Sequence, residues 1–157
     1  MHKNFYLCNV KKTVFFNDIP NLNLKEADLL DWIYEQVSEK GAKIKRLDIN
    51  FISEDKMLNL NREHLKHDNH TDILTFCYND HLTIESEIFI CFERACENAQ
   101  KHSQTPENEV LRLISHGLLH IFGMKDNTRR LRNAMANEED KIIAKFHVKH
   151  TTSEKTL

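Results

Sequence analysis

The chain has 157 residues, of which 40% are hydrophobic and 29% are charged, and its formal net charge is -2. This length and composition predict one soluble folded domain over residues 1–157. They exclude a disordered chain, and the chain is too short for two domains of ordinary size. The small net charge excludes attraction of nucleic acid by the molecule as a whole. No apolar run approaches the ~20 residues of a membrane helix and the start lacks the apolar core of a signal peptide, so we expect a cytoplasmic protein.

Three segments at the start of the chain show regular hydrophobic spacing. Residues 5–8 and 13–16 are rich in aromatic and apolar side chains, and we expect short strands or an extended segment there. Residues 25–40 follow a helical period, and Gly41 ends that helix. Its apolar face would consist of Ala27, Leu30, Ile33, Tyr34 and Val37.

A small sheet is predicted from the next apolar segments. Residues 44–52 alternate like a half-buried strand, with Leu47, Ile49 and Phe51 on the apolar side. Ser53 then caps a short helix. Beyond a polar connection, two further strands are expected at about 71–78 and 85–92, and the short polar loop between them favours an antiparallel pair.

The second half of the chain is predicted to be mostly helical. One helix runs from Glu93 to about His102, and a final amphipathic helix runs from Arg129 to about His147. Residues 151–157 are expected to be frayed. With a third helix between these two, the predicted fold class is α+β, a small mixed sheet with helices packed around it.

That third helix has the clearest local signals and contains two histidines. Thr105 is a suitable N-cap, with Pro106 at the first helical position. Gly123 is placed to end the helix. The apolar face would consist of Val110, Leu113, Ile114, Gly117 and Ile121.

His116 and His120 are four residues apart, so both rings project from one face of this helix. After the Gly123 turn the chain can bring Asp126 back towards them. Two imidazoles and one carboxylate form a three-ligand site with an open position, most simply for zinc. The alternative is that both histidines pack in a polar core without a metal.

Three segments together carry a specific combination of motifs. Residues 116–126 read His-Gly-Leu-Leu-His, two residues, then Gly-Met-Lys-Asp; residues 60–61 read Leu-Asn, before Thr-Asp-Ile-Leu-Thr-Phe at 71–76; and residues 86–88 read Ser-Glu-Ile. In order and spacing they resemble motifs of the YbeY family of bacterial rRNA-maturation endoribonucleases, a set of zincin-like metalloproteins. The resemblance covers about residues 44–143.

The resemblance implies a zincin-like metal helix and a metal-dependent hydrolase, a single-strand-specific endoribonuclease acting in rRNA maturation and ribosome quality control. It implies one Zn²⁺ per chain, bound by His116, His120 and Asp126, with the two histidines as the catalytic residues. The expected partners are rRNA precursors and ribosomal proteins, with no membrane and no DNA.

Two positions depart from the family pattern. The third metal-binding histidine of the family falls on Asp126, a residue type that also binds zinc. The family arginine in the loop before Thr71 falls on Leu65, with Arg62 nearby. This departure leaves a non-catalytic, metal-containing RNA- or ribosome-binding assembly factor as the alternative. A metallopeptidase is a weaker alternative, because Gly117 stands where His-Glu-x-x-His enzymes keep their general base.

Cationic residues near these motifs are candidates for RNA contact. Lys125 and Arg132 belong to a cluster that directly follows the metal motif. Beside a metal such charges would steer phosphates into the site, whereas alone they would form a solvated helix start. The RNA-binding candidates are Arg62, Lys66, Arg129 and Arg130.

The remaining polar candidates have an ordinary structural interpretation as well. Three evenly spaced histidines are compatible with a second metal site, although a solvated loop is favoured: His64, His67 and His70. Glu87 would either accept a hydrogen bond from a ligating imidazole or be an ordinary acid on a strand face. Glu138 and Glu139 are expected to face solvent. The four cysteines lack Cys-x-x-Cys spacing, and we expect all of them to be thiols that bind no metal.

Overall fold

The computed structural model describes residues 11–64 and 71–154. Within them the elements are, in order, β1 (Val14–Asn17), α1 (Glu26–Glu39), β2 (Lys43–Ile52), α2 (Glu54–His64), β3 (Ile73–Cys77), β4 (Thr83–Cys91), α3 (Phe92–Lys101), α4 (Pro106–Ile121) and α5 (Arg129–Glu154). In this part of the chain no helix combines the length and the apolar character that crossing a membrane requires. Each segment predicted from residue 13 onward corresponds to an observed element, whereas residues 5–8 lie outside the described residues.

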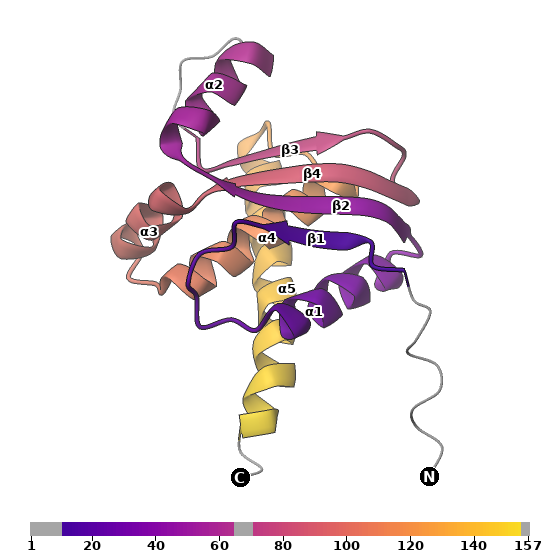
Figure 1. Ribbon diagram of the computed structural model, residues 1–157. Coiled ribbons are helices and arrows are strands. Elements are labelled where there is room, and N and C mark those ends of the chain that lie inside the picture. Colours follow the sequence, from indigo (N-terminus) through magenta and orange to yellow (C-terminus); the bar gives the residue numbers. More distant parts are fainter. Residues whose placement is uncertain (1–10, 65–70, 155–157) are drawn as a thin grey trace, which may run out of the picture.

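The four strands form one mixed sheet in the order β1-β2-β4-β3 (Figure 1). β1 and β2 are parallel, as are β2 and β4, and β3 is antiparallel to β4 with Thr75 opposite Ile88. The predicted antiparallel pair and the α+β class are therefore confirmed. The topology leaves β3 at an edge of the sheet as the structure describes it.

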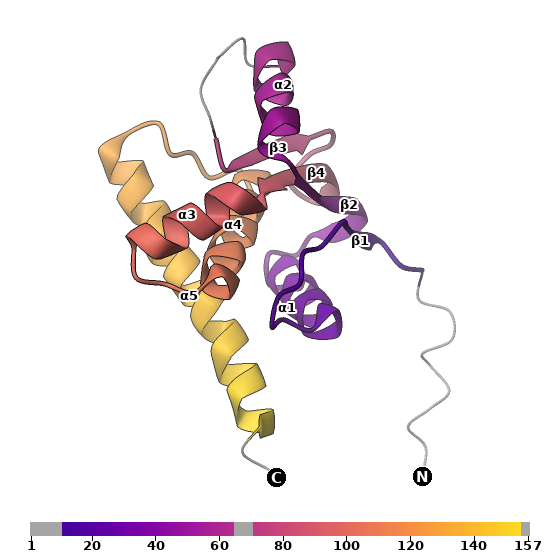
Figure 2. The same ribbon diagram turned by 60° about the vertical axis from the view of Figure 1, so that its left-hand side comes forward.

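The main core lies between one face of the sheet and the helices α1 and α4, with α5 as an outer layer (Figures 1 and 2). Leu47, Ile49 and Ile88 are fully buried on the sheet side, in agreement with the alternation predicted for the first two. The Trp32 indole N–H of α1 donates a hydrogen bond to the Ile142 carbonyl of α5 at 2.9 Å. The helix with the two histidines, α4, is thus enclosed by the sheet on one side and α5 on the other.

α2 lies on the opposite side of the sheet (Figure 1). The Ser53 hydroxyl accepts a hydrogen bond from the Lys56 amide at 3.3 Å, which confirms the predicted cap of this helix. A second, smaller apolar cluster is buried there, consisting of Met57, Leu74 and Cys91. Among the described cysteines, Cys77, Cys91 and Cys96 are free thiols, as expected, and Cys8 lies outside the described residues.

The buried face of α1 differs from the predicted one. Tyr34 is 37% exposed, and Ala27 is exposed as well. Trp32 is the largest side chain of the helix and packs edge-on against Phe146 of α5, with ring centroids 5.5 Å apart. The need to bury this ring turns the helix, so that the buried side chains are Leu29, Trp32, Ile33, Gln36 and Val37.

α5 is longer than the sequence pattern indicated. It continues to Glu154, beyond the expected end near His147. The sequence contains no Gly or Pro after Gly123, so no helix-breaking residue interrupts its hydrogen-bond ladder. Of the segment expected to be frayed, residues 151–154 are helical, and residues 155–157 lie outside the described residues.

Candidate metal centre

α4 starts as predicted and packs closely against the sheet. The Thr105 side chain accepts a hydrogen bond from the Asn108 amide at 3.1 Å, and Pro106 occupies the first helical position. A missing N–H costs nothing there. A Cβ at Gly117 would lie 2.8 Å from Cδ1 of Ile88. The absence of a side chain at this position therefore allows α4 to approach β4 beside the edge strand β3.

A tight turn at the C-terminal end of α4 reverses the chain. Gly123 has a φ of +98°, a conformation that glycine adopts without steric strain. Its amide donates to the His120 carbonyl at 2.9 Å, and the Met124 amide donates to the Leu119 carbonyl at 3.0 Å. These two hydrogen bonds form a Schellman motif. The turn carries Asp126 back towards the histidines, as the sequence predicted.

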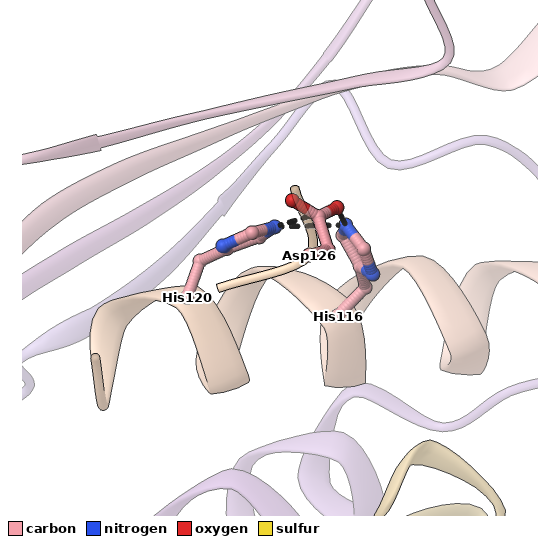
Figure 3. A group of neighbouring side chains, drawn as sticks. All are labelled: His116, His120 and Asp126. Atoms are coloured by element: carbon pink, nitrogen blue, oxygen red, sulfur yellow. Dashed lines mark hydrogen bonds and ion pairs between the residues drawn. The ribbon is translucent and has the colours of Figure 1, made fainter. Parts of the chain in front are cut away.

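Three donor atoms converge at this turn, and Figure 3 shows the three side chains pointing towards one another. The Nε2 atoms of His116 and His120 are 3.0 Å apart. Oδ2 of Asp126 lies 3.5 Å from the first and 3.4 Å from the second. Zinc with tetrahedral bonds of about 2.0–2.1 Å separates its donors by about 3.3 Å. The triangle therefore fits a divalent ion, and three protein ligands leave one coordination position open.

Hydrogen bonds on the far side of each ring orient the two imidazoles. Nδ1 of His116 is 2.7 Å from Oε1 of Glu139, and Nδ1 of His120 is 3.0 Å from the Met124 carbonyl oxygen. Both acceptors require the proton on Nδ1, which leaves the Nε2 lone pairs directed towards Asp126. Burial lowers the pKa of His116, but the hydrogen bond and charge of Glu139 outweigh it, so the net pKa is raised. A proton therefore competes with a metal for this ring.

Glu139 was expected to face solvent, and this prediction is wrong. Its side chain is 9% exposed, and besides the His116 ring it contacts Nη1 of Arg112 at 3.0 Å. The buried face of α5 also contains Met135 and Ile142, four residues before Glu139 and three after it. A carboxylate on an apolar helical stripe was the sequence signal that the prediction missed.

The other carboxylates have different partners. Glu87 accepts a hydrogen bond from the Tyr78 hydroxyl at 3.0 Å. The carboxylate that accepts a hydrogen bond from a candidate ligand is therefore Glu139 and not Glu87. Glu138 is partly exposed and forms an ion pair with Lys141 at 2.8 Å. One of the two consecutive acids in α5 therefore contacts the candidate ligands, and the other lies at the surface as predicted.

The triad lies in a pocket of about 480 Å³ between α4 and the edge strand β3. The Asp72 carbonyl accepts a hydrogen bond from the Cys91 amide of β4 at 2.9 Å, and the Tyr78 amide donates one to the Glu85 carbonyl of β4 at 2.8 Å. Antiparallel pairing alternates along a strand, so the backbone groups of residues 73, 75 and 77 point to the open edge instead. The residues of β3 and its approach that line the pocket are Thr71, Asp72, Ile73, Leu74, Thr75 and Cys77.

Known proteins match this chain over most of its length. A family model described as Endoribonuclease YbeY matches residues 16–147. The chain belongs to the YbeY family. Endoribonuclease YbeY of Christiangramia forsetii is 32% identical over 134 residues, which is 85% of this chain and 94% of that protein. The same enzyme of Cytophaga hutchinsonii is 34% identical over 132 residues, or 83% and 92% of the two chains. The solution structure of a Thermotoga maritima protein shows the same fold, with a TM-score of 0.64 at 23% identity over 90% of this chain and 93% of that one.

This YbeY-family chain carries cationic side chains just beyond the triad. Arg129 and Arg130 are exposed in the first turn of α5, and Lys125 is exposed next to Asp126. Nη1 of Arg132 donates to the Asp126 carbonyl at 3.4 Å, so this arginine supports the turn. Lys125, Arg129 and Arg130 therefore place positive charge within a few residues of the candidate ligands.

Of the candidates in or beside the polar loop before β3, those that the structure describes do not line the pocket of this YbeY-family chain. Arg62 is exposed on α2 and does not belong to the described residues that line the pocket. His64 packs edge-on against Phe76, with ring centroids 5.1 Å apart. The other positions considered there lie outside the described residues: Leu65, Lys66, His67 and His70.

Proposed function

We propose that this protein is a metal-dependent endoribonuclease that cleaves single-stranded regions of rRNA precursors. The observation that carries the proposal is the triangle of His116, His120 and Asp126 donors, with sides of 3.0–3.5 Å, inside a pocket of about 480 Å³. Membership of the YbeY family supports RNA as the substrate. Because the ligands are half-buried in a cleft, a flexible single strand can bring a phosphate to them more readily than a duplex.

Zn²⁺, one per chain, is the ion that this donor set favours, because two imidazoles, one carboxylate and an open position are typical of catalytic zinc. The ion, when bound, would polarise a phosphate oxygen and lower the pKa of a water molecule. His116 and His120 are the proposed catalytic residues through their Nε2 atoms. Glu139 and the Met124 carbonyl keep those atoms in the required tautomer and direction.

Two alternatives are weighed against this function. An assembly factor that binds rRNA or ribosomal proteins without cleavage is favoured by Leu65, which stands where the family has an arginine. A metallopeptidase is disfavoured because the position of its general base is Gly117, whose Cα faces Ile88 in the core. We propose rRNA precursors and ribosomal proteins as partners and the cytoplasm as the location.

The deciding experiment uses protein purified without a histidine tag and loaded with zinc. It is incubated with a labelled single-stranded RNA, the same RNA as a duplex, and an unstructured polypeptide. We expect cleavage of the single strand alone, lost on addition of a chelator and in the double variant His116→Ala, His120→Ala. The double variant His102→Ala, His147→Ala is the matched control, since both histidines are exposed and outside the pocket lining. Binding of RNA without cleavage would favour the assembly factor.

A further inference from the structure

His81, in the hairpin between β3 and β4, contacts the end of the helix that carries the candidate ligands. Its Nδ1 lies 2.9 Å from the Ile121 carbonyl oxygen and is the donor, because a carbonyl only accepts. The same ring covers the turn, since a Cβ at Gly123 would lie 3.0 Å from Nε2 of His81. One hairpin residue thus touches both the last carbonyl of α4 and the glycine that reverses the chain.

The hydrogen bond to Ile121 completes the helix end. A helix leaves its last four carbonyls without partners inside the helix. In α4 the carbonyls of residues 118–120 accept hydrogen bonds from the amides of residues 122–124. The Ile121 carbonyl is the next along the chain, and His81 supplies its donor. A residue 40 positions earlier in the sequence therefore finishes the capping of the metal-motif helix.

The hairpin itself holds His81 in place. Oδ1 of Asp80 accepts hydrogen bonds from the Leu82 and Thr83 amides, each at 2.9 Å. A carboxylate bonded to amides two and three residues later closes a tight turn. His81 lies inside this turn, so its backbone is fixed by the hairpin and not by α4. The ring can therefore act as a fixed contact against which the end of α4 is positioned.

We propose that His81 is a positioning residue for the metal centre, and that it fixes the turn at residues 121–124 that delivers Asp126. The proposal rests on the metal site of the proposed function. Two candidate ligands depend on this turn, because Asp126 follows it and the His120 ring donates to the Met124 carbonyl within it. If the turn loosens, the third ligand and the orientation of the second are both affected.

The test compares three variants of the full chain. His81→Ala removes the donor, and His81→Asn keeps an N–H near the position of Nδ1. His102→Ala is the matched control, because Nδ1 of His102 lies 2.9 Å from the Asn98 carbonyl at the end of α3, outside the pocket lining. Two quantities are measured: the zinc dissociation constant, by competition with a chromophoric chelator, and hydrogen exchange of the Gly123 and Met124 amides in metal-free protein.

For His81→Ala we expect zinc binding weakened about 10-fold, the lower end of the effect of removing a residue that supports a metal ligand from outside. We also expect faster exchange of both amides, and recovery of both properties in His81→Asn. His102→Ala should change neither. Unchanged zinc affinity in His81→Ala would overturn the proposal, even with faster exchange, because the bond would then serve only the helix end. If the parent binds no zinc, the metal site of the proposed function fails. Unchanged exchange in His81→Ala would separately reject the role of His81 in the turn.

Discussion

At the scale of single residues, Asp126 supplies the anionic donor of the triad, 3.4–3.5 Å from both imidazole Nε2 atoms. Replacing it with alanine would leave two of the three proposed ligands, and we expect zinc affinity to fall by more than the roughly 10–100-fold that follows removal of a residue supporting a ligand from outside. Asp126→His should retain binding, because a third imidazole is an equally competent ligand. Zinc content after dialysis and the dissociation constant measure both effects.

The control for this change is Asp31→Ala, which removes an exposed carboxylate from α1. It changes the net charge of the chain by the same amount without touching the pocket. If Asp126→Ala bound zinc as tightly as the parent, Asp126 would not be a ligand, and the third donor would have to be sought elsewhere.

Glu139 is the second residue with a specific expected effect. Its Oε1 accepts the Nδ1 proton of His116 at 2.7 Å and its Oε2 contacts Arg112 at 3.0 Å. Glu139→Gln removes the negative charge that makes the imidazole a better ligand, so zinc affinity should fall about 10–100-fold. The neighbouring Glu138→Gln removes an acid that pairs with Lys141 at the surface, and it should leave affinity unchanged. Equal affinities in the two variants would contradict this role of Glu139.

At the scale of elements, α4 combines well-capped ends with a buried acid near its start. Burial, and secondly the charge of Asp72, raise the pKa of Glu109 above its usual value of 4.5, although Arg112 opposes them. A pKa that is raised on folding means that the contribution of Glu109 to stability is full below about pH 4.5 and is lost as pH rises through the folded-state pKa. Ionised Glu109 therefore destabilises the fold at neutral pH.

Glu109→Gln should consequently have a larger free energy of unfolding than the parent at pH 7, and the difference should disappear near pH 4. Urea unfolding of metal-free protein at both pH values measures it. Glu93→Gln, which replaces an exposed acid in the first turn of α3, should show no such pH-dependent gain. A Glu109→Gln variant less stable than the parent at pH 7 would show that the carboxylate is favourable in the fold.

At the scale of the whole molecule, the formal net charge of -2 gives no general attraction to RNA. We propose that the exposed Arg129 and Arg130, close to the triad, supply a local attraction. We expect the double variant Arg129→Gln, Arg130→Gln to bind single-stranded RNA more weakly. The slope of log affinity against log salt should become shallower by roughly 0.7 for each phosphate that the variant no longer neutralises.

The control removes two cations near the opposite end of α4, in the double variant Lys25→Gln, Lys101→Gln. Lys101 ends α3 just before α4, and the backbone near Lys25 is tied to the start of α4 by the bond from the Asn23 amide to Glu107 at 3.1 Å. The net charge changes equally in both double variants. Equal losses of RNA affinity would show that overall charge, and not the position of the arginines, controls binding.

The amino-acid sequence by itself determined the parts of this protein that depend on near neighbours in the chain. The start of α4 at Thr105 and Pro106, its end at Gly123, and the common face of His116 and His120 all follow from residues a few positions apart. The antiparallel pairing of β3 with β4 is similarly local, because a short loop joins the two strands. Capping, helical spacing and turn chemistry operate within about one or two turns of the chain, so they can be recognised without the fold.

Only the tertiary structure decided which distant residues surround this helix. Glu139 reaches His116 across 23 positions and His81 reaches Ile121 across 40. The buried face of α1 likewise depends on α5, where Trp32 bonds to a carbonyl 110 positions away. These contacts arise from how α5 and the hairpin pack on α4 and α1, and many packings are compatible with the same local periodicity. A carboxylate on an apolar stripe remains ambiguous in the sequence until its buried partner is known.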